Sequence, residues 1–245
     1  MSDARHGLHR HTILARATFG IALLLAAGAS AYEGAPVADG GTIAGAMTYL
    51  GKVPPPVVLP IDKDPAVCGK TVKHDEGLIV SAGKGLKNVV VFLDKIERGK
   101  PVKPGAATLA NTECRYEPHV QAFVVGTELA VSNSDPVLHN THIKLPRSDV
   151  FNYGLPTQGQ VVKKKVRRPG LMKVGCDAGH SWMLAWVAVF EHPYFAVTNA
   201  DGRYTIADVP PGGYTLVFWH EKLGRKTQAI QVTAKGKVDA SLAWK

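Results

Sequence analysis

The sequence lacks the motifs that mark the common enzyme families. The segment Gly83-Lys-Gly85 lacks the further glycine of a dinucleotide-binding loop, and the segment that begins at His220 lacks the second histidine of a zinc-protease helix. No Gly-x-Ser-x-Gly nucleophile motif occurs, and no pair of carboxylates stands out as a catalytic acid and base. We therefore expect a protein that is not an enzyme.

Long apolar runs are also scarce. Of the 245 residues, 45% are hydrophobic and 20% are charged, which excludes a disordered chain and a multispanning membrane protein. The exception is the N-terminus, where three arginines precede an apolar run at 21–27 and the cleavage pattern Ala29-Ser-Ala31. This run is too short for a membrane span. Residues 1–31 are therefore predicted to be a signal peptide, and the mature chain a periplasmic or secreted protein without a membrane span.

Helical periodicity is absent as well. The 25 glycines and 16 prolines recur along the chain and separate short apolar stretches, a pattern that is typical of β-strands. The segment 182–190 is so apolar that we expect it in the interior of a sheet. After His192, strand-like stretches alternate with Asp-Gly and Pro-Gly turns, which predicts a small β-sandwich. The predicted fold class is all-β.

Cysteine is scarce, with Cys68, Cys114 and Cys176 the three in the chain. An odd number in an exported protein allows at most one disulfide and leaves a thiol for another role, and three pairings are possible. Cys68 and Cys114 have no potential metal ligands at close spacing, whereas Cys176 has them. We therefore expect a disulfide between Cys68 and Cys114, which would pin the irregular segment 52–80 to the core.

The residues around Cys176 have the chemistry of a copper site. Cys176, His180 and Met183 supply a thiol, an imidazole and a thioether within eight residues, and His139 and His142 lie upstream. A thiolate, two imidazoles and a weak thioether form the ligand set of redox-active copper. His139 and His142 are three residues apart, so they would point to opposite faces of a strand. We favour His139 as the ligand, with His142 as the alternative. The weaker candidates are His119, His192 and His220.

The segments 133–140 and 176–183 resemble the two ligand segments of cupredoxins, the blue-copper β-sandwich proteins. The resemblance implies a cupredoxin-like Greek-key β-sandwich over residues 41–193, with its core at about 85–193. The pattern Cys-x3-His-x2-Met also matches half of the dinuclear copper loop of cytochrome oxidase subunit II. That loop has a second cysteine where this sequence has Met172, so we expect one copper per chain.

The C-terminal part, 194–245, is similar to carboxypeptidase regulatory-like (prealbumin-like) domains. The similarity is carried by residues 198–206 (TNADGRYTI) and 209–216 (VPPGGYTL). It implies a small β-sandwich and no activity of its own. The strand at 42–50 also resembles the opening strand of that module, which leaves open the boundary with the cupredoxin-like domain.

These features predict one-electron transfer by a single type 1 copper, held by His139, Cys176, His180 and Met183. The donor or acceptor would be a redox protein, and a basic run in the sequence favours an acidic one. Nucleic acid is not an expected partner, because no aromatic residue interleaves this run. Two alternatives remain: a copper carrier or storage protein without redox cycling, and a metal-free structural or adhesion module. The basic run consists of Lys163, Lys164, Lys165, Arg167 and Arg168.

Overall fold

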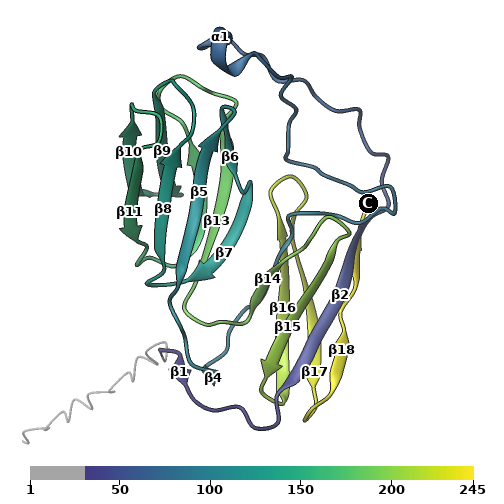
Figure 1. Ribbon diagram of the computed structural model, residues 1–245. Helices are drawn as coiled ribbons and strands as arrows, with labels where there is room; N and C mark the ends of the chain where they lie inside the picture. Colours follow the sequence, from purple (N-terminus) through teal and green to yellow (C-terminus); the bar gives the residue numbers. More distant parts are fainter. Residues whose placement is uncertain (1–30) are drawn as a thin grey trace, which may run out of the picture. The chain divides into compact units, whose positions relative to one another are not determined.

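The chain is built almost entirely from β-strands, as the computed structural model of residues 31–245 shows (Figure 1). Residues 1–30, where we expect the signal peptide, lie outside the described residues. Within 31–245 the one helix is α1 (Pro65–Cys68). No helix in that range is long and apolar enough to cross a membrane. The predicted all-β fold class is confirmed.

The first β-sandwich consists of two sheets whose neighbouring strands are mostly not consecutive in the chain. The order is β10-β9-β12-β13-β7 in one sheet and β11-β8-β5-β6 in the other. The chain therefore crosses repeatedly between the sheets, as expected of a cupredoxin-like Greek-key sandwich. The strands are β5 (Ala106–Thr112), β6 (Arg115–Glu117), β7 (Val120–Val124), β8 (Glu128–Asn133), β9 (His139–Leu145), β10 (Ser148–Leu155), β11 (Val161–Lys165), β12 (Gly170–Gly175) and β13 (Leu184–Phe190).

Strand β13 shows why an unbroken apolar run belongs inside a sheet. It pairs with β12 on one side and with β7 on the other. One face of β13 places Val187 and Val189 in the core of the first sandwich. The opposite face packs Ala188 against Val90 and Val120 in a separate apolar cluster. Because both faces are covered, the alternation of polar and apolar residues that marks a half-exposed strand is missing.

A second, smaller sandwich combines the C-terminal strands with two strands from the N-terminal half. Its sheets have the orders β14-β3-β16-β17 and β15-β2-β18, and β19 also pairs with β2. The strand at 42–50, whose membership the sequence left open, thus pairs with C-terminal strands. The strands are β2 (Gly41–Tyr49), β3 (Val90–Leu93), β14 (Phe195–Val197), β15 (Arg203–Val209), β16 (Gly212–His220), β17 (Gly224–Val232), β18 (Lys237–Asp239) and β19 (Leu242–Trp244), while β1 (Glu33–Gly34) pairs separately with β4 (Arg98–Gly99).

Residues 57–75, which we call the strap, extend from the connection between β2 and β3. Backbone hydrogen bonds join the arms of the strap, from Leu59 N to Lys73 O and from Asp75 N to Val57 O, both 2.9 Å long. Helix α1 lies at its tip, above the end of the first sandwich in the view of Figure 1. A disulfide joins Cys68 in α1 to Cys114 between β5 and β6. The predicted disulfide is confirmed, and it pins the strap to the first sandwich.

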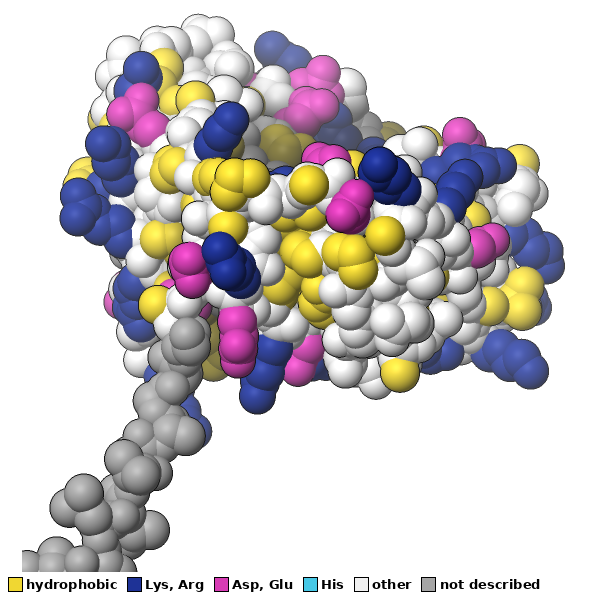
Figure 2. Space-filling model, turned by 90° about the horizontal axis from the view of Figure 1, so that it is seen from below, with side chains coloured by type: hydrophobic (Ala, Val, Ile, Leu, Met, Phe, Trp, Pro, Cys, Tyr) yellow, Lys and Arg dark blue, Asp and Glu magenta, His cyan; other side chains and the backbone are white. Residues whose placement is uncertain are grey.

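Positive charge is concentrated at one sheet edge. Strand β11 pairs only with β8, so its lysines lie on an edge strand, where charge discourages pairing with another chain. All five residues of the basic run are exposed. On the face seen from below, by contrast, Lys and Arg side chains are scattered over the surface with Asp and Glu among them (Figure 2). The basic run therefore differs from the mixed charge of that face.

Candidate metal centre

Three of the predicted ligands meet at one end of the first sandwich. His139 begins β9, Cys176 directly follows β12, and His180 lies in the loop before β13. Their potential ligand atoms, one from each residue, lie within 4.8 Å of one another. His139 and His180 are fully buried, and Cys176 is 9% exposed. Cys176 is also the free cysteine of the described residues. A thiol and two imidazoles thus share a site from which water is largely excluded.

Asn140 ties together the two chain segments that carry these ligands. Its backbone N–H donates to Sγ of Cys176 at 3.3 Å, and its side-chain Oδ1 accepts from the Asp177 N–H at 3.2 Å. The pairing of β9 with β12 brings the segments alongside each other. A hydrogen bond to sulfur stabilises the thiolate, because it offers a donor to the charged form. The sulfur is therefore fixed in position by the backbone of the neighbouring strand.

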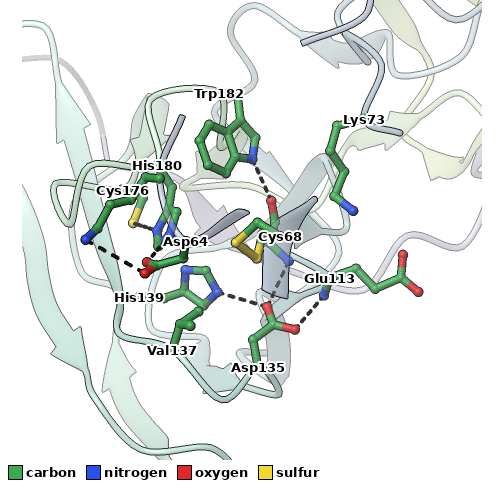
Figure 3. The surroundings of a disulfide bond; sticks show 12 residues. Asp64, Cys68, Lys73, Glu113, Asp135, Val137, His139, Cys176, His180 and Trp182 are labelled. Carbon is green, nitrogen blue, oxygen red and sulfur yellow. Dashed lines mark hydrogen bonds and ion pairs between the residues drawn. A yellow bond between two sulfur atoms is a disulfide. The ribbon is translucent and has the colours of Figure 1, made fainter. Parts of the chain in front are cut away.

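Asp135 orients the ring of His139 (Figure 3). Nε2 of His139 donates to Oδ2 of Asp135 at 2.9 Å, and the carboxylate also accepts the N–H groups of Glu113 (2.9 Å) and Cys114 (2.8 Å). Since an ionised carboxylate only accepts, Nε2 carries the hydrogen and Nδ1 keeps a lone pair. Burial lowers the pKa of His139 and favours the neutral ring, although Asp135 acts in the opposite direction.

His180 is held in the same way from another part of the chain. Its Nε2 donates to Oδ2 of Asp64 in the strap at 2.9 Å, and its Nδ1 lies 3.5 Å from Sγ of Cys176. The centroids of the His139 and His180 rings are 4.7 Å apart. Figure 3 shows Asp64 and Asp135 beside these two rings, with Cys176 next to His180. Each imidazole therefore has its Nε2 occupied by a carboxylate.

The residues present fit a copper ion. Nδ1 of His139 is buried and has no hydrogen-bond partner among the described residues, which is costly for a polar atom that nothing occupies. A metal would remove that cost. A thiolate and two neutral imidazoles are soft to intermediate donors, which suit copper better than magnesium or calcium. Met183, the predicted fourth ligand, is buried in the same core cluster as Cys176, and its N–H donates to the His180 carbonyl at 3.0 Å.

The alternative ligand His142 is engaged elsewhere. Its Nδ1 contacts Oδ2 of Asp177 at 2.5 Å and its Nε2 contacts Oδ1 of Asp149 at 2.7 Å. Neither ring nitrogen is left for a metal, and the structure brings His139 rather than His142 to Cys176. This separation follows from the odd spacing of the two histidines along β9.

The weaker candidates lie away from the cluster and have partners of their own. His119 pairs with Glu221. His192 contacts the Leu93 carbonyl through Nε2 at 3.1 Å. His220 accepts the Lys222 N–H through Nδ1 at 3.3 Å.

Several residues that support the centre were missing from the sequence-based prediction. Asp135 could have been found, because it precedes His139 by four residues in a turn that the sequence marks clearly. Tyr116 donates to the Asn140 carbonyl at 2.5 Å, and burial, with the nearby Cys176, raises the pKa of its hydroxyl. Asp64 is 116 residues from His180. The sequence offered one indication that Asp64 lies near the centre, namely the expected disulfide at Cys68, four residues further along the chain.

Comparison with known proteins gives limited matches. No curated protein sequence matches the chain. A family profile described as polysaccharide lyase family 4, domain II, matches residues 174–240. This match covers less than half of the chain and gives no support for the expected carboxypeptidase regulatory-like domain.

Among solved structures, a copper-containing nitrite reductase from Thermus scotoductus SA-01 is 18% identical, with a TM-score of 0.32, over 41% of this chain and 25% of its own. A purple cupredoxin from Nitrosopumilus maritimus is 22% identical, with a TM-score of 0.29, over 34% of this chain and 98% of its own. A mutant of amicyanin in its Cu(I) form is 19% identical, with a TM-score of 0.30, over 34% of this chain and 81% of its own. TM-scores this low do not support a function for the chain.

Proposed function

We propose that this protein is an exported copper protein that transfers single electrons through one type 1 copper. The observation that carries the proposal is the buried Nδ1 of His139, which has no hydrogen-bond partner within residues 31–245, beside the free thiol of Cys176 and the imidazole of His180. These are the donors of a trigonal copper site, and they converge where solvent is largely excluded. No substrate is transformed in this role.

Each residue of the centre has a distinct task. A bound copper ion would supply the one-electron redox chemistry. Cys176 supplies the thiolate, which the Asn140 N–H stabilises, while His139 and His180 supply the two imidazole nitrogens. Met183 would supply a fourth, weak sulfur donor. Because Asp135 and the backbone hold these groups before a metal binds, little rearrangement accompanies a change in charge, which favours fast electron transfer.

The decisive experiment is the visible absorption spectrum of the copper-loaded protein. A type 1 site gives an intense thiolate-to-Cu(II) charge-transfer band, and Cys176→Ser should abolish it, because oxygen does not reproduce the covalent bond of sulfur to copper. Zinc-loaded protein is the matched control and should be colourless, since Zn²⁺ has a filled d shell. A colourless parent protein with Cu(II), or an unchanged band in Cys176→Ser, would refute the proposal.

The same proposal includes a partner and a location. An acidic redox protein in the periplasm or outside the cell would dock at the basic run, which lies in β11 and directly after it, where opposite charge raises the association rate. Long-range attraction between exposed charges is screened by salt. Electron transfer with such a partner should therefore slow as ionic strength rises, which stopped-flow measurements can follow.

A copper carrier is the second candidate, and the burial of His180 favours it. The His180 side chain is fully buried and hydrogen-bonded to Asp64 of the strap, and a closed site keeps its ion better than an open one. Slow oxidation and reduction by small redox reagents, in a protein that holds copper tightly, would identify a carrier. In a metal-free structural module of an exported protein, Cys176 would be expected in a disulfide, whereas its thiol is free among the described residues.

A further inference from the structure

The strap lies directly over the loop that carries two of the proposed ligands. Ile61 and Val67 of the strap pack against the core of the first sandwich. A Cβ added at Gly179 would lie 3.6 Å from Cγ of Lys63, so the strap leaves room for little more than a methyl group beside the loop 176–180 at this point. The strap is therefore a packed part of the metal centre's surroundings.

Asp64 in the strap stands at the N-cap of α1 but does not cap it. At a typical N-cap, the aspartate carboxylate accepts a backbone N–H of the first helical turn. Here no such bond forms, and the backbone of Asp64 has φ 50°, in the left-handed region that residues with a Cβ rarely adopt. The carboxylate instead accepts the Nε2–H of His180. Asp64 thus adopts an unfavourable backbone conformation at the position from which its carboxylate reaches the His180 imidazole.

This contact determines which nitrogen of His180 can bind a metal. Because the carboxylate only accepts, the hydrogen stays on Nε2 and the lone pair on Nδ1. That Nδ1 is the atom 3.5 Å from Sγ of Cys176. Asp135 acts on His139 in the same way, so both rings present Nδ1 to the centre. Carboxylates in this position orient metal-binding histidines and typically change metal affinity 10–100-fold.

We propose that Asp64 is a positioning residue of the metal centre. It holds the ring and the tautomer of His180, and with the strap it closes that side of the centre to solvent. This role rests on the proposed function, since it is a role toward bound copper. The disulfide at Cys68 and the Asp64–His180 contact both join the strap to the first sandwich.

The test compares Asp64→Asn with Asp62→Asn in the full-length, disulfide-bonded protein. Both variants remove one negative charge from the strap at constant size, but Asp62 is exposed and forms no hydrogen bond or ion pair with the described side chains, whereas Asp64 bonds His180. Copper affinity should fall about 10-fold or more in Asp64→Asn and remain at the parent value in Asp62→Asn. The reduction potential should rise in Asp64→Asn alone, because loss of an anion bonded to a ligand disfavours Cu(II). Asp64→Glu should restore part of both properties.

A direct readout keeps the role of Asp64 separate from general stability. In the Cu(I)-loaded protein, NMR should detect a slowly exchanging Nε2 proton on His180, and Asp64→Asn should speed its exchange while the unfolding midpoint stays close to that of Asp62→Asn. If the parent binds copper and Asp64→Asn matches it in affinity, potential and proton exchange, the positioning role is wrong and the proposed function stands. If the parent binds no copper, the proposed function fails and this role fails with it.

Discussion

At the scale of single residues, substitution of the two histidines of β9 should have opposite effects on the charge-transfer band. His139→Gly should leave a gap beside the metal, and added imidazole should refill it and restore the charge-transfer band, because His139 offers a free Nδ1. His142→Gly should leave the band nearly unchanged, since both nitrogens of His142 are paired with Asp177 and Asp149. Absorption spectra of copper-loaded variants, recorded while imidazole is added, measure both effects. Loss of the band in His142→Gly would show that the first ligand has been assigned to the wrong histidine.

The residues that donate to the proposed metal could be predicted from the sequence because most of them lie close together along the chain. Cys176, His180 and Met183 lie within eight residues, and an odd separation distinguishes His139 from His142. The residues that orient the donors follow no such rule. Asp64 and His180 meet only because the strap folds over the loop, and no periodicity in the sequence links positions 116 apart.

At the scale of elements, the disulfide that fastens the strap should contribute strongly to stability. Cys68 and Cys114 are separated by 46 residues, and closing a loop of that size stabilises the folded state by about 4 kcal/mol in the chain-entropy model. Both sulfurs are buried, so the double variant Cys68→Ala with Cys114→Ala avoids burying new hydroxyl groups. Urea unfolding of the metal-free double variant should show an unfolding free energy about 4 kcal/mol lower than that of the metal-free parent.

Cys176→Ala is the matched control for this prediction, because it removes a buried thiol and leaves the disulfide intact. Cys176→Ala should lower the unfolding free energy much less than the double variant does. Equal losses in the two proteins would mean that the disulfide stabilises only through its packing, and the chain-entropy account would then be wrong.

Elements with a clear pattern were predictable and elements that bury polar residues were not. The turn at Asn199 forms as its sequence suggests, with Oδ1 accepting the N–H groups of Asp201 and Arg203 at 3.0 and 2.9 Å. Strand β9 has no alternation of apolar and polar residues, because His139, Thr141 and His142 are all buried. A pattern based on hydrophobicity cannot detect a strand whose buried face is polar.

At the scale of the whole molecule, the all-β class was predictable, but the contacts that join the sandwiches were not. The ring centroids of Trp186 in β13 and Trp219 in β16 are 4.9 Å apart, and the Trp186 indole N–H donates to the Glu221 carboxylate at 2.9 Å. Burial alone would raise the pKa of Glu221, but its hydrogen bond and charge interaction with His119 hold the pKa below the usual range. These partners come from distant segments, and their meeting depends on the discontinuous course of the second sandwich.

His220, at the end of β16 in this region, should make the stability of the whole molecule depend on pH. Burial, as the largest cause, lowers its pKa from 6.5 to about 4, and its Nδ1 accepts the Lys222 N–H. Between these two values the unfolded chain binds a proton that the folded chain does not, so stability falls as pH falls. From pH 7 to pH 5 this histidine should lower the unfolding free energy by about 2 kcal/mol.

His220→Asn keeps an acceptor near the Lys222 N–H but does not titrate. In urea unfolding, the metal-free form of this variant should lose about 2 kcal/mol less unfolding free energy than the parent over that pH interval. The other buried histidines, including His192, whose pKa burial also lowers, are present in both proteins and cancel in the comparison. An identical pH dependence in the two proteins would mean that His220 is protonated in the folded state at pH 5.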